Sequence, residues 1–595
     1  MKILKSLPQR YRIHFQYCLF LIILGSLIYG NHLKNPFQFD TVAYITNQHR
    51  LDNIEEQLNI EFFKKQFYQR GLLQISVALN ARLDGFRTFG YHLINLTFHL
   101  INSLLVYFIT CRACRYFQLG RYHAQESEIR VISIFTAIFF LSHPIQTESV
   151  VYIMSRSEVL AATFYLCAFL LFQTYLDRDS QPKLGFKTLV SFVIPIAFVL
   201  GFSVKQTVIT LPMMLLLYFL FGQSSGSVII RVLNKWKWEI GFIFLIGLLF
   251  LFRKLLTDES FLIGPSTAGE DIGRLNYIFT QPYVILFYYL KLFAFPINLN
   301  LDPDIQVITE WWSWRLWSGV VAIIGSIYFS YRAKETRFLF FLVLWFLVVI
   351  SPSSSIITLT DLAAEHRTYL ASYAFYAISI ILLYKVSYLI IPKHSQKRRF
   401  FLLVSCVFMS VVFCLLTIQR NQIWANEVSL WSDTLKKSPE KIRPMINLAR
   451  AHTTIGNFDI AVDYYEKIMI LNPNIFATNF NLGNLYLKRG REEDALRLFQ
   501  TAAILGPKIP EVHGLLGEIY LQKKQIELAK LHLKRAVEIR PNYAIAMKNL
   551  GIINYFYLQK PKEALVYFLR SLSIDPDQDD AEKIRTLINQ LKELP

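Results

Sequence analysis

Apolar residues dominate the first two-thirds of the chain, up to about Leu416, and a polar, Lys- and Glu-rich pattern follows. In the first part, apolar runs of roughly 15–20 residues alternate with short polar segments, and this is the length that an α-helix needs to cross a bilayer. The runs lie near residues 14–30, 91–110, 131–143, 158–176, 188–202, 205–222, 239–256, 315–331, 338–356, 369–389 and 400–418. The pattern predicts an all-α membrane unit with about eleven transmembrane helices.

Lysine and arginine gather in alternate connections between these runs. The cations are Arg112, Arg115, Arg121 and Arg130; Arg178, Lys183 and Lys187; Arg231, Lys235 and Lys237; Arg332, Lys334 and Arg337; and Lys393, Lys397, Arg398 and Arg399. By the positive-inside rule these connections are cytoplasmic, so the N-terminus is predicted inside and the C-terminal third outside. The apolar stretch 277–295 is predicted to lie on the outer interface, because a crossing there would move the last two cationic segments outside. The net charge of +19 is therefore a topology signal and not a nucleic-acid footprint.

The last third of the chain repeats every 34 residues, as the spacing of Leu448, Leu482, Leu516 and Leu550 shows. Small residues and a closing proline follow at matching positions, with one inserted residue in the last unit. They are Ala449, Gly483, Gly517 and Gly551; Ala461, Ala495, Ala529 and Ala564; and Pro473, Pro507, Pro541 and Pro576. This pattern is typical of tetratricopeptide repeats, in which small residues let two helices approach and the proline ends the second helix.

The period also continues upstream, because Trp431 and Pro439 occupy the places expected one unit earlier. We therefore predict two domains, a transmembrane domain over residues 1–420 and a repeat domain over residues 421–595. The second domain holds a partial repeat and about four full repeats, which stack into an extracytoplasmic α-solenoid.

Polar side chains of the membrane part gather at the predicted outer ends of the spans. They include Asp40, Glu148, Arg156, Glu158, Lys205, Asp302, Asp304 and the run Glu365-His-Arg367. A single ionisable residue at a helix end is commonly an interfacial anchor, but a set that falls on one leaflet indicates a functional site. A second polar set lies within the run at 91–110, where His92, Asn95, His99 and Asn102 form one stripe. That stripe predicts hydrogen bonds between helices inside the bundle, with His92 alone near the outer site.

Several motifs, taken in order, resemble one family. They are Phe39-Asp40, His143-Pro-Ile-Gln-Thr-Glu148, Ser155-Arg156, Thr210-Leu-Pro212, Pro352-Ser-Ser-Ser355 and Ala364-Glu-His-Arg-Thr-Tyr369, followed by the repeats. The combination resembles the transmembrane and tetratricopeptide-repeat-containing O-mannosyltransferases and their bacterial relatives. The resemblance implies an inverting glycosyltransferase of the GT-C type. It also implies a polyprenyl-phosphate-linked sugar donor and an active site on the lumenal or periplasmic face.

Transfer of a sugar from a lipid phosphate to a hydroxyl needs a carboxylate that accepts the hydroxyl proton, and cations that stabilise the departing phosphate. Asp40 is the predicted base. The family usually has a second acid after this position, where the present chain has Thr41, so Glu148 is a candidate for the second carboxylate. The candidates for binding the donor phosphate are Arg367, His366, Lys205 and Arg156. A divalent metal stays open, and no other cofactor is expected.

The repeats offer a candidate surface for the acceptor. Asn447, Asn481 and Asn549 recur one position before the repeated leucine, where the first helix of each unit faces the concave surface, and Leu515 interrupts the series. An amide side chain donates to and accepts from a peptide backbone, so such an asparagine ladder suits an extended protein acceptor. The alternative interpretation is that these amides simply solvate the concave face.

These observations together predict a membrane glycosyltransferase that moves a sugar from a polyprenyl-phosphate donor to a hydroxyl of a protein acceptor bound by the repeats. One alternative is a transferase that acts on a glycan or glycolipid, with repeats that recruit a partner. Another is a non-enzymatic membrane scaffold. The short array, and the absence of Asn-x-Ser/Thr sequons outside the membrane runs, favour a bacterial inner membrane over an endoplasmic reticulum membrane with lumenal repeats.

Overall fold

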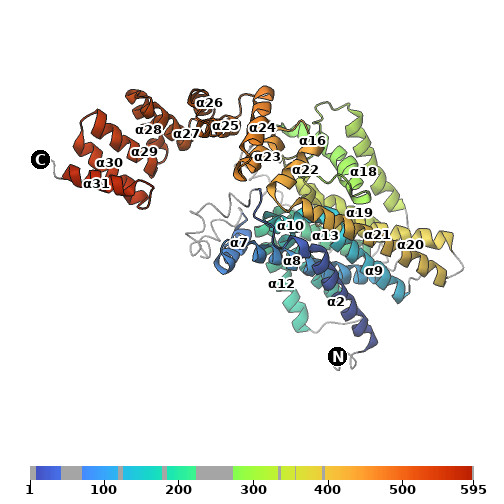
Figure 1. The fold of residues 1–595 in the computed structure, drawn as a ribbon. Coiled ribbons are helices and arrows are strands. Elements are labelled where there is room, and N and C mark those ends of the chain that lie inside the picture. The colour runs from blue at the N-terminus through green and yellow to red at the C-terminus, as the bar shows by residue number, and fades with distance from the viewer. Residues whose placement is uncertain are drawn as a thin grey trace, which may run out of the picture. The chain divides into compact units, whose positions relative to one another are not determined.

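The computed structural model describes residues 8–39, 41, 70–117, 125–176, 184–222, 272–332, 337–355, 357–391 and 395–592. These parts of the chain are helical and contain no β-strand, as the ribbon in Figure 1 shows. By its internal contacts the chain divides into two units, Met1–Pro439 and Glu440–Pro595.

The first unit is built from long apolar helices joined by short 3₁₀ and π segments. Its main helices are α2 (Gln9–Tyr29), α7 (Gly71–Asp84), α8 (Thr88–Tyr116), α9 (Glu126–Ser142), α10 (Thr147–Val151), α11 (Arg156–Leu176), α12 (Leu184–Val204), α13 (Leu211–Gly222), α16 (Arg274–Tyr283), α17 (Leu290–Ala294), α18 (Trp314–Arg332), α19 (Arg337–Ile350), α20 (Ser372–Ile390), α21 (Ser395–Ile423) and α22 (Glu427–Lys437).

Five helices in the described parts are long and apolar enough to cross a membrane, or up to six if the bent pair around Pro144 counts as one span. The sequence predicts about eleven spans, which is more than the five or six found in the described residues. The predicted run at 239–256 lies outside the described residues, and each of the other predicted runs coincides with a helix. Three of those helices, Thr188–Val204, Gln206–Gly222 and Arg337–Ser353, are short, and α18, although 19 residues long, is not among the helices that are apolar enough. The apolar helices fit a membrane protein.

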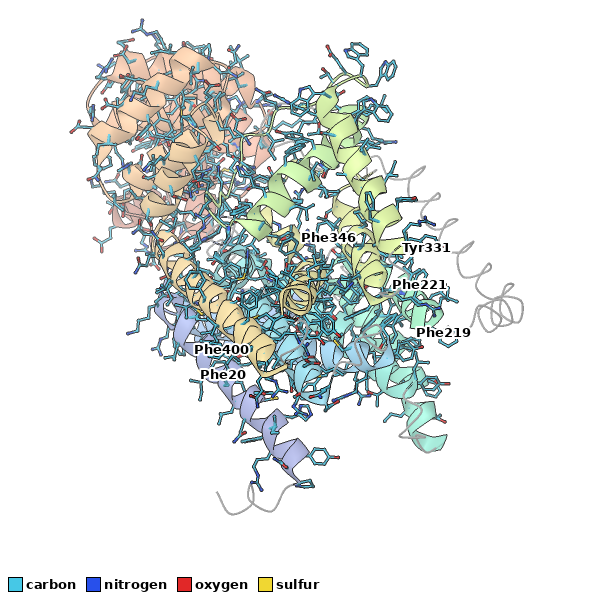
Figure 2. All side chains as sticks on the ribbon, turned by 90° about the vertical axis from the view of Figure 1, so that its right-hand side faces the viewer. Phe20, Phe219, Phe221, Tyr331, Phe346 and Phe400 are labelled. Atoms are coloured by element: carbon cyan, nitrogen blue, oxygen red, sulfur yellow. The ribbon has the colours of Figure 1, made fainter. Side chains whose placement is uncertain are left out.

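The outer surface of the first unit is apolar where helices lie at its edge. Only 22% of the most apolar window of α2 and 28% of that of α21 is buried within the protein. Phe20 on α2 and Phe400 on α21 are 48% and 69% exposed, whereas Phe346 on α19 is 7% exposed; Figure 2 labels all three. Exposed aromatic and aliphatic side chains of this kind suit contact with lipid acyl chains.

The segment 277–295, which the sequence predicts to lie on the outer interface, forms α16, a π-helical segment (Val284–Tyr289) and α17. It is not one of the helices that are long and apolar enough to span. Pro282 lies against Gly319 of α18, where a Cβ atom on the glycine would stand 2.4 Å from the proline carbonyl carbon. The two helices therefore touch through their backbones at this point.

The helix α22 packs with the first unit, although the sequence places residues 421–439 in the repeat domain. Trp431 is fully buried. Asp433 accepts hydrogen bonds from Arg420 at 2.6 Å and from Lys437 at 2.7 Å, and Lys437 also donates to the Leu299 carbonyl at 2.7 Å. These contacts explain why the boundary by contacts lies after Pro439 and not after residue 420.

The second unit is a series of helix pairs. The helices are α23 (Ile442–Thr454), α24 (Phe458–Leu471), α25 (Phe476–Lys488), α26 (Glu492–Leu505), α27 (Pro510–Gln522), α28 (Ile526–Ile539), α29 (Ala544–Ile552), α30 (Pro561–Ile574) and α31 (Ala581–Lys592), coloured orange to red in Figure 1. The repeated small residues lie where paired helices touch: a Cβ atom on Gly483 would stand 2.9 Å from the Phe499 ring. Ala461, Ala495 and Ala529 are fully buried.

Gly319→Ala tests the close contact between α16 and α18. The added methyl group meets the backbone of Pro282, which has little freedom to move, so we expect a loss of about 1–3 kcal/mol of stability. Thermal unfolding of the purified protein in detergent measures this. Gly325→Ala is the matched control on the same helix, because nothing lies within 4 Å of its Cβ position. An equal melting temperature for the two variants would contradict the contact.

Candidate active site

The candidate site is built where apolar helices are interrupted. The helix α9 ends at Ser142, and the chain bends by 49° between it and the helical segment Pro144–Val151, which contains α10. His143 fixes this bend: its Nδ1 accepts from the Ile145 N–H at 3.3 Å, and its Nε2 donates to the Phe293 carbonyl at 3.1 Å. The bend places Glu148 in the first turn of α10.

Glu148 and His366 form the central pair. The imidazole Nδ1 of His366 lies 2.6 Å from Glu148 Oε1, and the His366 backbone N–H donates to Oε2 at 3.2 Å. The Glu148 side chain is 4% exposed and that of His366 is 27% exposed. Burial lowers the pKa of His366, and the neighbouring Glu148 carboxylate opposes this effect. Because the carboxylate accepts from Nδ1–H, the outer nitrogen Nε2 remains available for a ligand.

A second pair lies beside the first. Lys205, which stands between α12 and the 3₁₀ turn that follows it, forms an ion pair with Glu158 in the first turn of α11. His366 Nε2 lies 4.0 Å from the same Glu158 oxygen. The charges of Arg70 and Arg367 also act on Lys205. The site therefore contains carboxylates and cations in alternation.

Arg367 borders the site on the same 3₁₀ turn as His366 (Glu365–Thr368). Its guanidinium donates to the Asp361 carbonyl at 2.8 Å. Arg70 lies at the start of α7 with a left-handed φ of 64°. The charges of both arginines act on Lys205, which pairs with Glu158.

Glu365 is a carboxylate that the predicted set of catalytic and phosphate-binding residues omits. It is 2% exposed, and its Oε1 accepts from the Asn300 N–H at 2.5 Å and the Tyr288 hydroxyl at 3.2 Å. Burial, with a further contribution from the Glu148 charge, raises the pKa of Glu365 to about 8, against the opposing charge of Arg420. The available sequence signal was its position directly before His366.

Arg156 lies apart from these groups. It is fully buried, and it donates to Asn95 Oδ1 at 2.9 Å, to the Ser76 carbonyl at 2.9 Å and to the Tyr91 carbonyl at 3.1 Å. These bonds tie α11 to α7 and α8. With its donor groups engaged by the protein, Arg156 is left out of the phosphate-binding set that we propose below.

The polar stripe of α8 also makes contacts within the bundle. Asn102 donates to the Val159 carbonyl at 2.8 Å and to the Tyr369 hydroxyl at 3.1 Å, and His99 Nδ1 lies 2.7 Å from that same hydroxyl. His92 Nε2 lies 3.1 Å from the Asn35 carbonyl. The stripe therefore connects helices, as its spacing predicted.

Asp40 lies outside the described residues. Its neighbours on both sides are described: the ring of Phe39 lies 5.7 Å from that of Tyr152, and Thr41 is fully buried. Thr41 lines a small pocket together with His92, Tyr152 and other residues of this region. Tyr152 follows directly after α10, the helix that carries Glu148.

The asparagine ladder lies on the first helices of three repeats. Asn447 on α23 is half-buried, and its amide donates to the Arg443 carbonyl of the same helix at 3.0 Å. Asn481 on α25 is half-buried, and Asn549 on α29 is only 6% exposed. Asn447 and Asn481 are therefore the accessible members of the series.

Within the parts of the chain that the structure describes, no group of three or more His, Cys, Asp or Glu side chains is placed to hold a metal ion. Glu148, Glu158 and Glu365 are engaged instead with His366, Lys205 and the Asn300 backbone.

Glu365→Gln tests the buried acid. The raised pKa means that the folded state favours the protonated carboxyl of Glu365. The contribution of this carboxyl to the free energy of unfolding is therefore complete below about pH 4.5 and is lost as the pH rises through about 8. We expect the melting temperature of the native protein to fall across this window more steeply than that of the variant. Gln retains an oxygen for Asn300 and Tyr288 but does not titrate. Parallel curves for the two proteins would contradict the assignment.

Comparison with known proteins bears on the repeats and on the chain as a whole. The family model described as tetratricopeptide repeat matches residues 446–510 and 480–544, which confirms the repeats. Among solved structures, MamA from Desulfovibrio magneticus RS-1 is 22% identical with a TM-score of 0.23, and covers 26% of this chain and 85% of its own. YrrB, described as a TPR protein with an unusual peptide-binding site, is 23% identical with a TM-score of 0.25, and covers 28% and 85%.

Curated relatives match over most of the chain. Protein O-mannosyl-transferase F38B6.6 of Caenorhabditis elegans is 25% identical over 77% of this chain and 63% of its own length. Protein O-mannosyl-transferase TMTC3 of Mus musculus is 23% identical over 96% and 65%, and TMTC1 of Homo sapiens is 22% identical over 78% and 56%. The alignments thus span somewhat less than two-thirds of each relative. They confirm the resemblance that the motifs predicted: this chain is similar to the tetratricopeptide-bearing protein O-mannosyl-transferases, from its membrane helices to its repeats.

Proposed function

We propose that the chain is a membrane glycosyltransferase that moves a sugar from a polyprenyl-phosphate-linked donor to a hydroxyl of a protein acceptor. The observation that carries the proposal is the meeting of three distant segments at one site. Glu148 and Glu158, Lys205, and the turn with His366 and Arg367 come together there with alternating charges. The relatives named as protein O-mannosyl-transferases make mannose the first sugar to test.

In the proposed reaction, the acceptor hydroxyl oxygen attacks C1 of the sugar while the bond from C1 to the phosphate oxygen breaks. Asp40 accepts the hydroxyl proton, and the electron pair of the broken bond stays on the departing lipid phosphate. Attack from the face opposite the phosphate inverts the configuration at C1. The role of Asp40 rests on the family resemblance and on its place between Phe39 and Thr41.

The departing phosphate needs fixed positive charge. Lys205 and Arg367 supply it, and His366 adds to it in the imidazolium form, which Glu148 stabilises at Nδ1 so that Nε2–H donates to the phosphate. Arg70 adds a fourth cation, since its charge reaches Lys205. Glu158 holds Lys205 before the donor arrives, and the phosphate then competes with this carboxylate. Glu148 in this scheme positions His366 and is not a second base.

The repeats are proposed to bind the protein acceptor, on the same extracytoplasmic side as the site. The support for this side is the alternation of cations along the chain. Reporter fusions after Pro595 and near Lys397 discriminate between the two orientations. The absence of Asn-x-Ser/Thr sequons outside the membrane runs supports a bacterial inner membrane as the location, with an endoplasmic reticulum membrane as the alternative.

Asp40→Asn should lower turnover by about 10²–10⁴-fold, the usual contribution of a general base, while donor affinity stays near normal. Arg367→Ala should instead raise the donor KM and lower kcat, since a phosphate ligand contacts the ground state and the transition state. The assay is mannose transfer by purified protein from a polyprenyl-phosphate donor to an unfolded acceptor.

Glu310→Gln is the matched control for the carboxylate change, because Glu310 is an exposed acid of the same unit and lies outside the candidate set. It should retain activity. Near-normal turnover in Asp40→Asn, with transfer otherwise present, would refute the base assignment. Absence of transfer by the native protein to any hydroxyl of a protein, with transfer to a glycan acceptor, would favour the glycolipid alternative.

The asparagine ladder should govern acceptor use without affecting the donor. Each lost amide removes hydrogen bonds worth roughly 0.5–1.5 kcal/mol, so a triple Ala variant at Asn447, Asn481 and Asn549 should bind a long acceptor about 10–1000-fold more weakly. Since Asn549 is nearly buried, most of this loss should appear in the double variant at Asn447 and Asn481. The comparison is KM for a long unfolded acceptor and for a short peptide.

The matched control for the ladder is Asn474→Ala, an exposed asparagine in the loop between α24 and α25. It should leave both KM values unchanged. Equal kinetics of the triple variant and native protein on both acceptors would show that the repeats bind something other than the acceptor backbone.

A further inference from the structure

One exposed stripe runs the full length of α18. It consists of Trp314, Trp317, Val321, Ile324, Tyr328 and Tyr331, spaced 3, 4, 3, 4 and 3 residues apart. These side chains are 48–67% exposed within the protein. Positions with this spacing lie on one face of a helix, so the stripe is continuous from end to end. Tyr331, which closes it, is labelled in Figure 2.

The opposite face of α18 is the one that packs against the protein. Leu316 is 8% exposed and Gly319 is buried against Pro282 of α16. The helix α18 therefore has two distinct sides. Its inner side is close-packed against the protein, and the described residues leave its outer side, which carries the stripe, uncovered.

The order of residue types along the stripe matches the profile of a bilayer. Tryptophans occupy its first end, aliphatic Val321 and Ile324 its centre, and tyrosines its last end. Trp and Tyr concentrate at the two membrane–water interfaces, while aliphatic side chains face the acyl chains. At 1.5 Å per residue the distance from Trp314 to Tyr331 is about 25 Å, close to the roughly 30 Å of a hydrocarbon core.

The tryptophan end is extended by the residues before the helix. Trp311 and Trp312 are 61% and 62% exposed, and the indole N–H of Trp317 donates to the Trp311 carbonyl at 2.9 Å. The guanidinium of Arg315 lies 5.7 Å from the centre of the Tyr283 ring and 5.9 Å from that of Trp314. We call Trp311, Trp312, Trp314 and Trp317 the tryptophan cluster. A cation among indoles suits the phosphate layer of lipid headgroups.

The segment before the cluster leads to the candidate site. The Ile308 N–H donates to the Thr280 hydroxyl at 2.9 Å, and the Asn300 N–H donates to Glu365 at 2.5 Å. The loop from Asn300 to the cluster is thus fastened at Asn300 to the carboxylate next to His366 and at Ile308 to Thr280 of α16.

We infer that the tryptophan cluster is an interfacial anchor that inserts into the headgroup layer of the bilayer, with the rest of the α18 stripe facing the acyl chains below it. The partner is the lipid surface itself. The anchor fixes the depth of the loop that holds Glu365, and so places the candidate site just outside the same leaflet. The inference is independent of the reaction proposed above.

The test is depth-dependent fluorescence quenching of the full-length protein in phosphatidylcholine vesicles whose acyl chains carry bromine at shallow or deep positions. The signal is the difference between native protein and a variant with all four tryptophans of the cluster changed to Phe. We expect this difference emission to be blue-shifted from that of indole in water, and to be quenched more by shallow bromines than by deep ones.

Two controls accompany the measurement. In the four-Phe variant, Ile324→Trp places one indole at the centre of the stripe, and deep bromines should quench it more than shallow ones. The five tryptophans outside the cluster, Trp236, Trp238, Trp345, Trp424 and Trp431, remain in every variant. The emission of the four-Phe variant, which carries only these five, is the baseline of the difference signal, and an unchanged melting temperature of that variant reports the native fold. A cluster emission like that of indole in water, unquenched by either lipid, would overturn the inference and indicate a surface for a soluble partner. Stronger quenching by deep bromines would also overturn it.

Discussion

The cost of burying charge governs the arrangement of the candidate site. An isolated ionised side chain away from water is strongly unfavourable, and a nearby opposite charge or hydrogen bond offsets much of that cost. Glu148 and Glu158 are nearly buried, and each has a basic partner from a distant segment, His366 and Lys205. If one partner were removed, an uncompensated charge would remain. The pairs therefore hold α10, α11 and the turn before α20 in one arrangement.

The pairs depend on breaks in otherwise apolar helices. A continuous span offers few places for a carboxylate or a cation, whereas a break brings polar side chains to helix ends. One break follows Ser142, where the chain bends into α10 and presents Glu148. The other separates α12 from the 3₁₀ turn Gln206–Thr210, and Lys205 stands directly before that turn. At both breaks a charged side chain reaches the site without lying in the middle of a span.

Much of the fold and some of the contacts in the candidate site could be predicted from the sequence, but the sequence signals differ between the repeats and the site. The repeats follow from exact spacing, since Leu448 and its equivalents have one structural role in every unit. Glu148, Lys205, His366 and Arg367 were singled out because ionisable residues at span ends are rare and gather on one side, and their role as site residues stays a prediction. Arg156 shares that signal but donates to Asn95 and two carbonyls, because side-chain type does not reveal which acceptors the fold brings near. Glu365 was passed over since its raised pKa depends on burial and on the nearby Glu148 charge, which local sequence does not specify.

Hydrogen bonds around Glu365 connect the site to its surroundings. Glu365 lies directly before His366, and its carboxylate is bound by the Asn300 backbone. Lys437 and Ser438 donate to the neighbouring carbonyls of Leu299 and Asp302, so the end of α22 holds the segment whose Asn300 N–H binds Glu365. A displacement of that segment would change the hydrogen bonds that keep Glu365 in place, and with it the turn that orients His366 towards Glu148. The position of the imidazole is therefore set by tertiary contacts on both sides of the turn, and not by the turn alone.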